Sequence, residues 1–312
     1  MLKISRGGNL LRWGIQFLIL IVATLVVYIV MDQGFPPAKP LLQPVASKQA
    51  DKDRKQQLHY VAVGDSLTEG IGDQTKRGGF VPIVAEDIQS RYQLQTIEVD
   101  NFGISGERSD QILKRVKQDQ DLRNNLQDAD FVTITVGGND LMKVIRNSFF
   151  ELTMKKFNKP RARYQERVTE IITEIRSLNS TVPIYTLGFY NPFYLNFPEI
   201  TDMQQVVDDW NEATEVATRQ FPKSYFIPIN DLLYQGLDQE VGVASNLTSS
   251  EEAKTVGEDE TDIGRVDNDV LYDEDKFHPN NIGYQLMANA VRDQLIATQN
   301  EWLKQGNEDS NE

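Results

Sequence analysis

The chain has 312 residues, of which 40% are hydrophobic and 25% charged, with a formal net charge of −14 and no cysteine. This composition supports one large globular domain with appended segments rather than a disordered chain. The acidic balance argues against nucleic-acid binding, because contacts to phosphates come from clusters of Lys and Arg. The lack of cysteine excludes disulfides, zinc–thiolate sites, thiol nucleophiles and a cysteine-linked lipid anchor.

The N-terminal region predicts a membrane anchor. A short basic segment, residues 1–14, precedes an apolar run at 15–31. The run has about the minimum length of a spanning helix, and the positive charge before it favours a cytoplasmic N-terminus. No small-residue cleavage site follows closely, so we expect an uncleaved single-pass anchor in the cell membrane; secretion after cleavage is the alternative. The Pro-rich, polar residues 32–57 then predict an extended linker to an extracellular domain.

Beyond the linker, strand-like runs alternate with amphipathic stretches. The strand candidates are residues 58–64, 96–101, 130–136, 183–187 and 224–229, and a last helix is expected over about 281–304. Such alternation is typical of a parallel sheet with crossover helices. We therefore expect one α/β domain over 58–305, followed by a polar tail at 306–312.

Two segments of the domain have a strong charge bias. Residues 238–269 are acidic and poor in apolar side chains, which predicts a solvated insertion. A calcium-binding loop is a weaker alternative there, because the glycine and glutamate of such loops are missing at the required spacing. Residues 141–167 are basic. They are interpreted as a solvated helix face or, beside a membrane anchor, as a patch that rests on anionic headgroups.

One serine follows the first predicted strand directly. The strand leads into the sequence Gly-Asp-Ser-Leu-Thr-Glu-Gly, in which the serine is Ser66. In open α/β sheets, ligands bind outside the carboxyl ends of the strands, where this hydroxyl would lie. A nucleophilic serine needs a base, and the chain has only two histidines, His59 and His278. His59 falls within the first strand, seven residues before Ser66, and is expected to be structural.

His278 is therefore the candidate base. A carboxylate three residues before it, Asp275, could fold back and accept the ring N–H, which would leave the other ring nitrogen for Ser66. Asp273 and Glu274 are nearby alternatives for this role. An ordinary polar loop before a helix cap would also explain the segment.

Two glycine-containing turns, at 101–106 and 137–140, follow the second and third strands. They would lie at the same sheet edge as Ser66. There a glycine N–H and an asparagine amide could donate to a reacting carbonyl oxygen. Simple turn chemistry would also account for both segments.

Taken in order, the four blocks that contain Ser66, Gly103, Asn139 and His278 resemble those of the SGNH or GDSL-type hydrolases. The amino-acid sequence of residues 70–73, 78–81 and 277–280 is similar to that of the YpmR-like branch of the superfamily. The resemblance implies a three-layer α/β/α sandwich, flavodoxin-like, around a five-stranded parallel sheet.

The resemblance also implies a set of roles. Ser66 would be the nucleophile, His278 the base and Asp275 the group that orients the base. The oxyanion hole would consist of the N–H groups of Ser66 and Gly103 and the side-chain amide of Asn139. No cofactor or metal is implied.

These features together predict a membrane-anchored extracellular serine esterase or lipase that acts on a small ester, a lipid or an acetylated glycan. An O-acetylesterase of cell-wall or exported polysaccharide is the alternative. A non-catalytic surface binding module and a metal-dependent phosphatase are weaker hypotheses. The module would be expected to have lost a site residue, and two histidines offer little for a two-metal centre.

Overall fold

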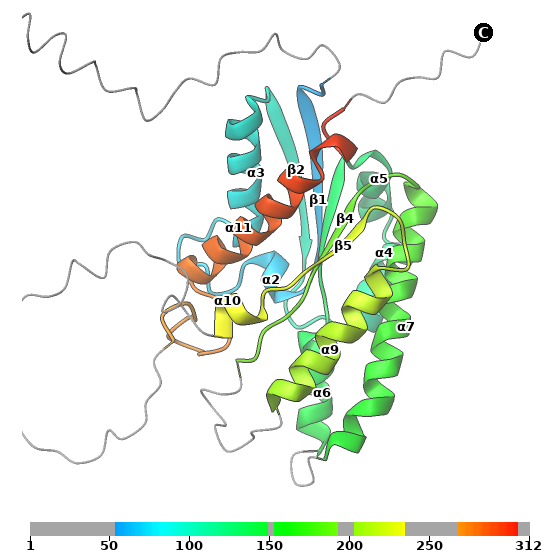
Figure 1. Cartoon of the computed structure of the whole chain (residues 1–312), viewed down its shortest axis with the longest axis vertical. Coiled ribbons are helices and arrows are strands. Elements are labelled where there is room, and N and C mark those ends of the chain that lie inside the picture. Colours follow the sequence, from blue (N-terminus) through cyan, green and yellow to red (C-terminus); the bar gives the residue numbers. More distant parts are fainter. Residues whose placement is uncertain (1–53, 149–152, 193–202, 235–267, 305–312) are drawn as a thin grey trace, which may run out of the picture. The chain divides into compact units, whose positions relative to one another are not determined.

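The fold is built on one five-stranded parallel sheet. A computed structural model describes residues 54–148, 153–192, 203–234 and 268–304. The strands are β1 (Gln57–Gly64), β2 (Thr96–Gly103), β3 (Phe131–Thr135), β4 (Ile184–Leu187) and β5 (Ser224–Ile227). They pair in the order β2-β1-β3-β4-β5, all parallel (Figure 1). All five predicted strands are confirmed, with small differences at their ends.

The strand order changes direction at β1, since β2 lies on one side of it and β3 to β5 on the other. Such a switch point opens a crevice at the carboxyl ends of the strands. The segment that leaves β1 is the one that carries Ser66. The topology therefore places this serine at the usual ligand-binding edge of an open sheet.

Helices follow every strand. They are α2 (Ser66–Glu69), α3 (Phe80–Tyr92), α4 (Ser109–Gln118), α5 (Gln120–Asp128), α6 (Gly138–Ser148), α7 (Met154–Leu178), α9 (Met203–Thr218), α10 (Asn230–Tyr234) and α11 (Asn281–Ala297), with a 3-10 turn at Gln299–Glu301. The last helix is shorter than predicted, because Thr298 caps it. The chain then turns so that Trp302 packs into the core and its indole N–H donates to the Leu295 carbonyl at 3.0 Å.

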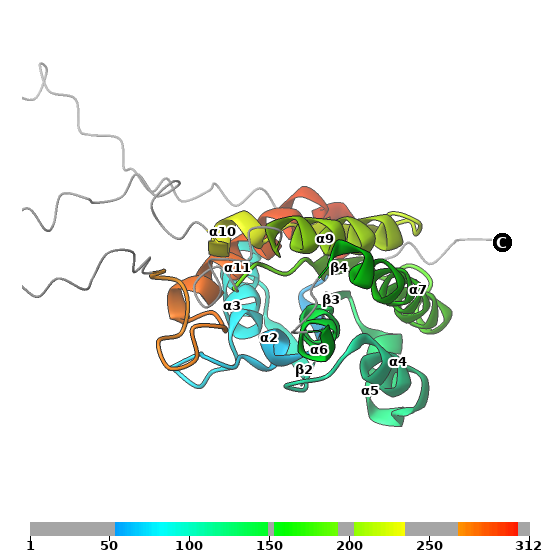
Figure 2. The same cartoon turned by 90° about the horizontal axis from the view of Figure 1, so that it is seen from below.

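Two hydrophobic cores lie on opposite faces of the sheet. Val61 and Val63 point to one face, where they meet α4, α5, α7 and α9. Tyr60 and Ala62 point to the other face, toward α3 and α11. The alternation of side chains along β1 thus separates the layers, and Figure 2 shows α3 and α11 on one side of the strands and α4, α5 and α7 on the other. The predicted α/β/α sandwich is confirmed.

Several predicted segments lie outside the described residues. They are the apolar run 15–31, the linker 32–57 apart from its last four residues, all but two residues of the acidic insertion 238–269, and the tail 306–312. Of the helices that the structure describes, none has both the length and the apolar character needed to cross a membrane. The anchor and the segment boundaries therefore stay predictions from sequence.

Candidate active site

Ser66 lies on a tight turn between β1 and the short helix α2. The residue is only 6% exposed. Gly64, which ends β1, has no room for a Cβ, because the hydroxyls of Thr135 and Thr68 occupy that space. The backbone of this turn therefore packs directly against β3. That close approach fixes the position of the serine.

Asp65 holds the turn from within. Its carboxylate accepts hydrogen bonds from the Leu67 N–H at 3.1 Å and from the Thr135 hydroxyl at 2.8 Å, and the Thr135 and Thr68 hydroxyls lie 2.8 Å apart. Asp65 is thus the N-cap of α2. Burial raises the pKa of Asp65, although the bonds from Thr135 and Leu67 offset part of that effect. The network ties β1, α2 and β3 together beneath Ser66.

The structure brings His278 to Ser66 across 212 residues of sequence. The His278 Nε2 atom lies 2.9 Å from the Ser66 Oγ atom, and Nδ1 lies 2.6 Å from the Asp275 Oδ2 atom. The other oxygen of Asp275 accepts the backbone N–H groups of Phe277, at 2.9 Å, and of His278, at 3.0 Å. A continuous chain of contacts therefore runs from carboxylate to imidazole to hydroxyl, between the three residues that the sequence singled out.

Asp275 is the carboxylate that meets the imidazole. Its two rivals are engaged elsewhere: Asp273 pairs with Lys276 Nζ at 2.5 Å, and Glu274 shares a hydrogen bond with Tyr272. Partial burial disfavours the charged form of Asp275. The hydrogen bonds from the His278 side chain and from two backbone N–H groups nevertheless hold the pKa of this carboxyl below its usual value. Asp275 therefore stays ionised at neutral pH.

The loop that carries His278 is fixed by contacts that the sequence did not reveal. The Tyr190 hydroxyl, from the segment after β4, donates to the Phe277 carbonyl. Gly72, with φ of +92°, lies against Pro279 and His278, where a side chain would collide with the Pro279 carbonyl. Both residues support His278 from a distance in sequence, so only an alignment could have singled them out.

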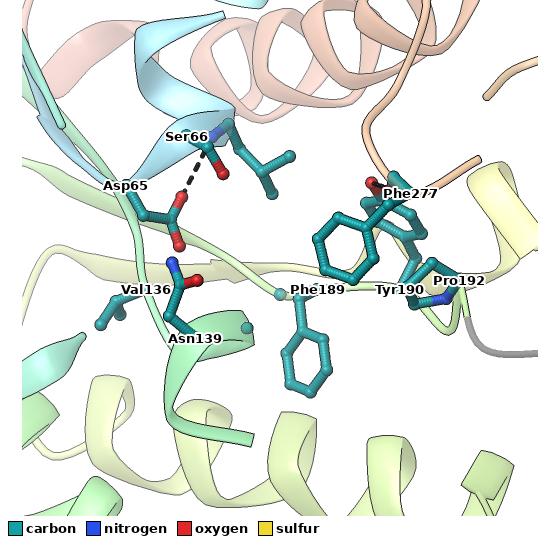
Figure 3. Close-up of a pocket in the computed structure, with 11 residues that line it drawn as sticks. Asp65, Ser66, Val136, Asn139, Phe189, Tyr190, Pro192 and Phe277 are labelled. Atoms are coloured by element: carbon teal, nitrogen blue, oxygen red, sulfur yellow. Dashed lines mark hydrogen bonds between the residues drawn. The ribbon is translucent and has the colours of Figure 1, made fainter. Parts of the chain in front are cut away.

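The predicted oxyanion donors differ in their hydrogen bonds. The Asn139 amide, at the start of α6, donates to the Glu107 carbonyl at 2.9 Å and points toward Asp65 and Ser66 (Figure 3). An amide has two N–H groups, so one can still serve a reacting carbonyl oxygen. The N–H of Gly103, by contrast, donates to the Asn101 side chain at 2.9 Å. This bond counts against Gly103 as a donor.

Gly106 lies in the turn that follows β2, next to Glu107. Its φ of +80° is the left-handed conformation that favours glycine, and the space in front of its Cα is empty. Among the described residues, no acceptor is found for the N–H groups of Gly106 and Ser66. Of the two glycines in this turn, Gly106 is therefore the one with an uncommitted N–H.

An apolar pocket opens beside Ser66 (Figure 3). It lies between the ends of β1, β3 and β4 and the His278 loop. Its walls are mainly hydrophobic and aromatic; they include Leu67, Val136, Phe189, Tyr190, Pro192 and Phe277. The sequence analysis did not anticipate these walls, which come from four separate segments. The pocket is small, with a cavity volume of about 30 Å³, so it has room for a short apolar group of a ligand whose reacting atom lies at Ser66.

The remaining histidine has a different environment. His59 Nε2 lies 2.8 Å from the Asp100 carboxylate on β2, and the His59 N–H donates to Asp130. These contacts connect β1 to β2 and to the residue before β3, in keeping with the structural role expected for His59. Within the parts of the chain that the structure describes, no three His, Cys, Asp or Glu side chains gather as metal ligands would.

Comparison with known families and proteins gives one family model and two curated relatives. The model of the GDSL-like lipase/acylhydrolase family matches residues 62–286. The chain is 35% identical to YpmR of Bacillus subtilis over 246 residues, which cover 78% of this chain and 84% of YpmR. It is 24% identical to the spore germination lipase LipC of Bacillus licheniformis over 189 residues, or 59% of this chain and 84% of LipC.

Solved structures share the same architecture. The lipase Lip_vut3 from a goat rumen metagenome superposes with a TM-score of 0.58 at 21% identity, covering 76% of this chain and 96% of Lip_vut3. Axe2, an acetylxylan esterase from Geobacillus stearothermophilus, superposes with a TM-score of 0.51 at 20% identity, covering 79% of this chain and 96% of Axe2. At these identities the similarity shows a common fold.

Proposed function

Because the chain belongs to the GDSL-like lipase/acylhydrolase family and is a hydrolase of ester bonds, we propose that it cleaves carboxyl esters by acyl transfer to Ser66. The observation that carries this proposal is the unbroken contact chain from Asp275 through His278 to Ser66, with distances of 2.6 and 2.9 Å. Each distance is within hydrogen-bond reach, as a nucleophile and its base require.

In the proposed reaction, the Ser66 oxygen attacks the ester carbonyl while His278 Nε2 takes the hydroxyl proton. Asp275 keeps the ring oriented and stabilises the imidazolium that forms. The C–O bond to the alcohol then breaks, and His278 returns the proton to the leaving oxygen. Water attacks the acyl-enzyme with the same base, which releases the acid and restores Ser66.

The negative charge on the tetrahedral intermediate needs fixed donors. We assign them to the N–H of Ser66, the second amide N–H of Asn139 and the N–H of Gly106. Gly106 replaces Gly103 in this assignment, because the Gly103 N–H already donates to Asn101. The Asn139 bond to Glu107, the residue after Gly106, supports a common location for these donors.

The acyl group would occupy the apolar pocket next to Ser66. Its aromatic side chains, Phe189 and Phe277, favour the hydrocarbon part of an ester over a polar group. A simple esterase or lipase is the first candidate, and the small volume of the pocket, about 30 Å³, suits a short acyl chain. The second is an O-acetylesterase of cell-wall or exported polysaccharide, which the fold shared with the acetylxylan esterase Axe2 makes worth testing.

We further propose that the enzyme is held at the cell membrane by the apolar run 15–31, with the domain outside the cell. The basic residues before the run support this orientation. The full chain is expected to stay in the membrane fraction after a high-salt wash, and its domain to be digested by protease added to intact cells. Recovery of a shortened chain in the medium would instead indicate cleavage and secretion.

The test of the catalytic proposal is an acyl-chain series on the full chain in detergent, with acetylated xylan and acetylated wall polymers alongside. Ser66→Ala should abolish hydrolysis of every ester that the enzyme accepts. Activity that survives this change would refute the role of Ser66. A protein that binds acyl esters without a burst of product would point to a binding module. Hydrolysis of acetyl esters alone would favour the O-acetylesterase, and longer chains a lipase.

A further inference from the structure

A second concave site, the basic groove, lies near the proposed active site. Five cationic side chains line it, and the only carboxylate among its lining residues is Asp140. The cations are Arg108, Lys143, Lys156, Arg163 and Arg167. They come from the segment before α4, from α6 and from α7. Figure 1 shows α6 and the start of α7 extending beyond the carboxyl edge of the sheet.

The charge of the groove is opposite to that of the molecule. The chain as a whole carries a formal charge of −14, so a hollow lined by five cations and one acid is a local reversal of sign. A concave surface of one charge concentrates the field and attracts ligands of the opposite charge. The groove is therefore suited to an anionic group.

The inner arginines are held in place by neighbouring side chains. Arg167 Nη1 lies 3.4 Å from both the Asp140 carboxylate and the Ser109 hydroxyl. Arg108 makes a two-point contact with Asp110, at 3.0 and 3.2 Å. Among the described residues, no acceptor is found for Nε and Nη2 of Arg167. These donors remain available to a ligand.

The outer cations are exposed. Lys143 on α6 and Arg163 on α7 both face solvent, and the described residues offer neither of them an ion-pair partner. Arginine presents a planar set of donors that matches phosphate oxygens, and lysine adds a mobile positive charge. The mixture of both is typical of a phosphate site.

The groove connects to the proposed oxyanion hole through two pairs of adjacent residues. Asn139 and Glu107 are joined by a hydrogen bond of 2.9 Å. Asp140 follows Asn139 and Arg108 follows Glu107 in the sequence, and both line the groove. The groove therefore begins one residue beyond the hydrogen bond that holds Asn139.

We propose that the basic groove binds a phosphate on the alcohol side of the ester substrate, so that the enzyme prefers esters whose leaving group carries a phosphate. The inference rests on the proposed function, and it names the substrate class of that site. The apolar pocket binds the acyl group of the substrate, and the basic groove binds the phosphate on its alcohol group. Its concave shape and its link to Asn139 favour a substrate group over a flat membrane surface.

The experiment compares two esters with the same acyl chain, 1-butyrylglycerol 3-phosphate and 1-butyrylglycerol. The full chain in detergent is expected to have the higher kcat/KM for the phosphate ester, and added NaCl should reduce this preference. The double variant Lys143→Gln, Arg163→Gln should lower the ratio of the two kcat/KM values by roughly tenfold. The matched control, Lys155→Gln with Lys159→Gln, removes two exposed charges of α7 outside the groove and should leave the ratio unchanged.

Binding separates this proposal from the catalytic one. In the Ser66→Ala background, 1-butyrylglycerol 3-phosphate should bind more weakly once Lys143 and Arg163 are replaced, whether or not Ser66 is the nucleophile. An unchanged ratio together with unchanged binding would overturn the proposal. A ratio that stays constant while binding to anionic phospholipid vesicles falls would also overturn it, in favour of docking on a membrane. Inorganic phosphate that competes with the phosphate ester, and not with the neutral one, would support it.

Discussion

The serine and the histidine of the proposed site are held in different ways. Ser66 lies at the carboxyl edge of the sheet, 6% exposed, on a turn fixed by buried hydrogen bonds among Asp65, Thr68 and Thr135. The His278 loop lies at the surface, and its Asp275 side chain is 36% exposed. The nucleophile is therefore coupled to the stability of the fold, whereas the base is positioned by its own turn and by single contacts from Tyr190 and Gly72. Substitutions on the two sides should consequently differ in what they damage.

The largest effect is expected from His278→Ala. Loss of the base should lower kcat by roughly 10⁴-fold or more, while the melting temperature changes little because the loop is superficial. Esterase assays and thermal denaturation of the same preparation would test both parts. A variant that unfolds several degrees earlier would contradict the view that the His278 side chain contributes little to stability.

His59→Ala is the matched control, since it removes the only other histidine. It breaks the contact with Asp100 and should leave kcat nearly unchanged, with any loss appearing in stability. If His59→Ala abolished activity and His278→Ala did not, the assignment of the base would be wrong.

The next effect concerns the oxyanion donors. Asn139→Ala removes an amide that points toward Ser66, and it should lower kcat on the order of a hundredfold with a smaller change in KM. Asn125→Ala, which removes an amide that donates to Asp121 within α5, should leave kcat unchanged. A change confined to KM in Asn139→Ala would show that this amide binds substrate without stabilising the transition state.

The oxyanion hole also shows the limit of the sequence. The sequence singled out Ser66 and Asn139 by their places after predicted strands, His278 as one of only two histidines, and Asp275 by its spacing from His278. The choice between Gly103 and a later glycine in the same turn could not be made that way. It depends on the Asn101 side chain accepting the Gly103 N–H, a contact between residues two apart that leaves no pattern in the sequence.

The sheet was predictable because buried parallel strands are rich in apolar and β-branched residues, and β1 from Tyr60 to Val63 and β3 have this character. The apolar pocket was not, since Phe189, Tyr190 and Phe277 come from irregular segments that only the tertiary fold brings together. The basic groove was likewise only partly predictable from the sequence. The sequence revealed a basic run at 141–167, but not that Arg108 joins it to enclose a concave site.

Substitutions in the hydrogen-bond network beneath Ser66 are expected to lower the stability of the fold. Thr135→Val keeps the shape of a fully buried side chain but removes the hydroxyl that serves Asp65 and Thr68. It should lower the free energy of unfolding by about 1–3 kcal/mol, because a buried carboxylate loses a donor. Chemical denaturation would measure this change.

Thr186→Val is the matched control on β4. Thr186 is equally buried, yet its hydroxyl oxygen has no hydrogen-bond partner among the described residues. The same substitution there should be neutral or stabilising. Equal losses at both positions would show that the network around Asp65 contributes nothing beyond ordinary packing.

The smallest effect is a dependence on pH at Asp65. Burial raises the pKa of Asp65 in the folded protein, so the unfolded chain releases this proton first as the pH rises. The charge therefore costs no stability below the unfolded pKa, about 4. The cost grows as the pH rises toward the folded value and is constant above it.

Asp65→Asn removes the charge and keeps a side-chain oxygen that can accept from Thr135 and Leu67. Its melting temperature should exceed that of the wild type by about 2 °C near pH 8, and the gain should shrink as the pH approaches 4. Asp128→Asn, at an exposed position, should show no such trend. A gain that is larger in acid than at pH 8 would mean that the folded state favours the Asp65 carboxylate, because such a group loses its stabilising effect as the pH falls. The charge of Asp65 would then stabilise the buried turn rather than destabilise it.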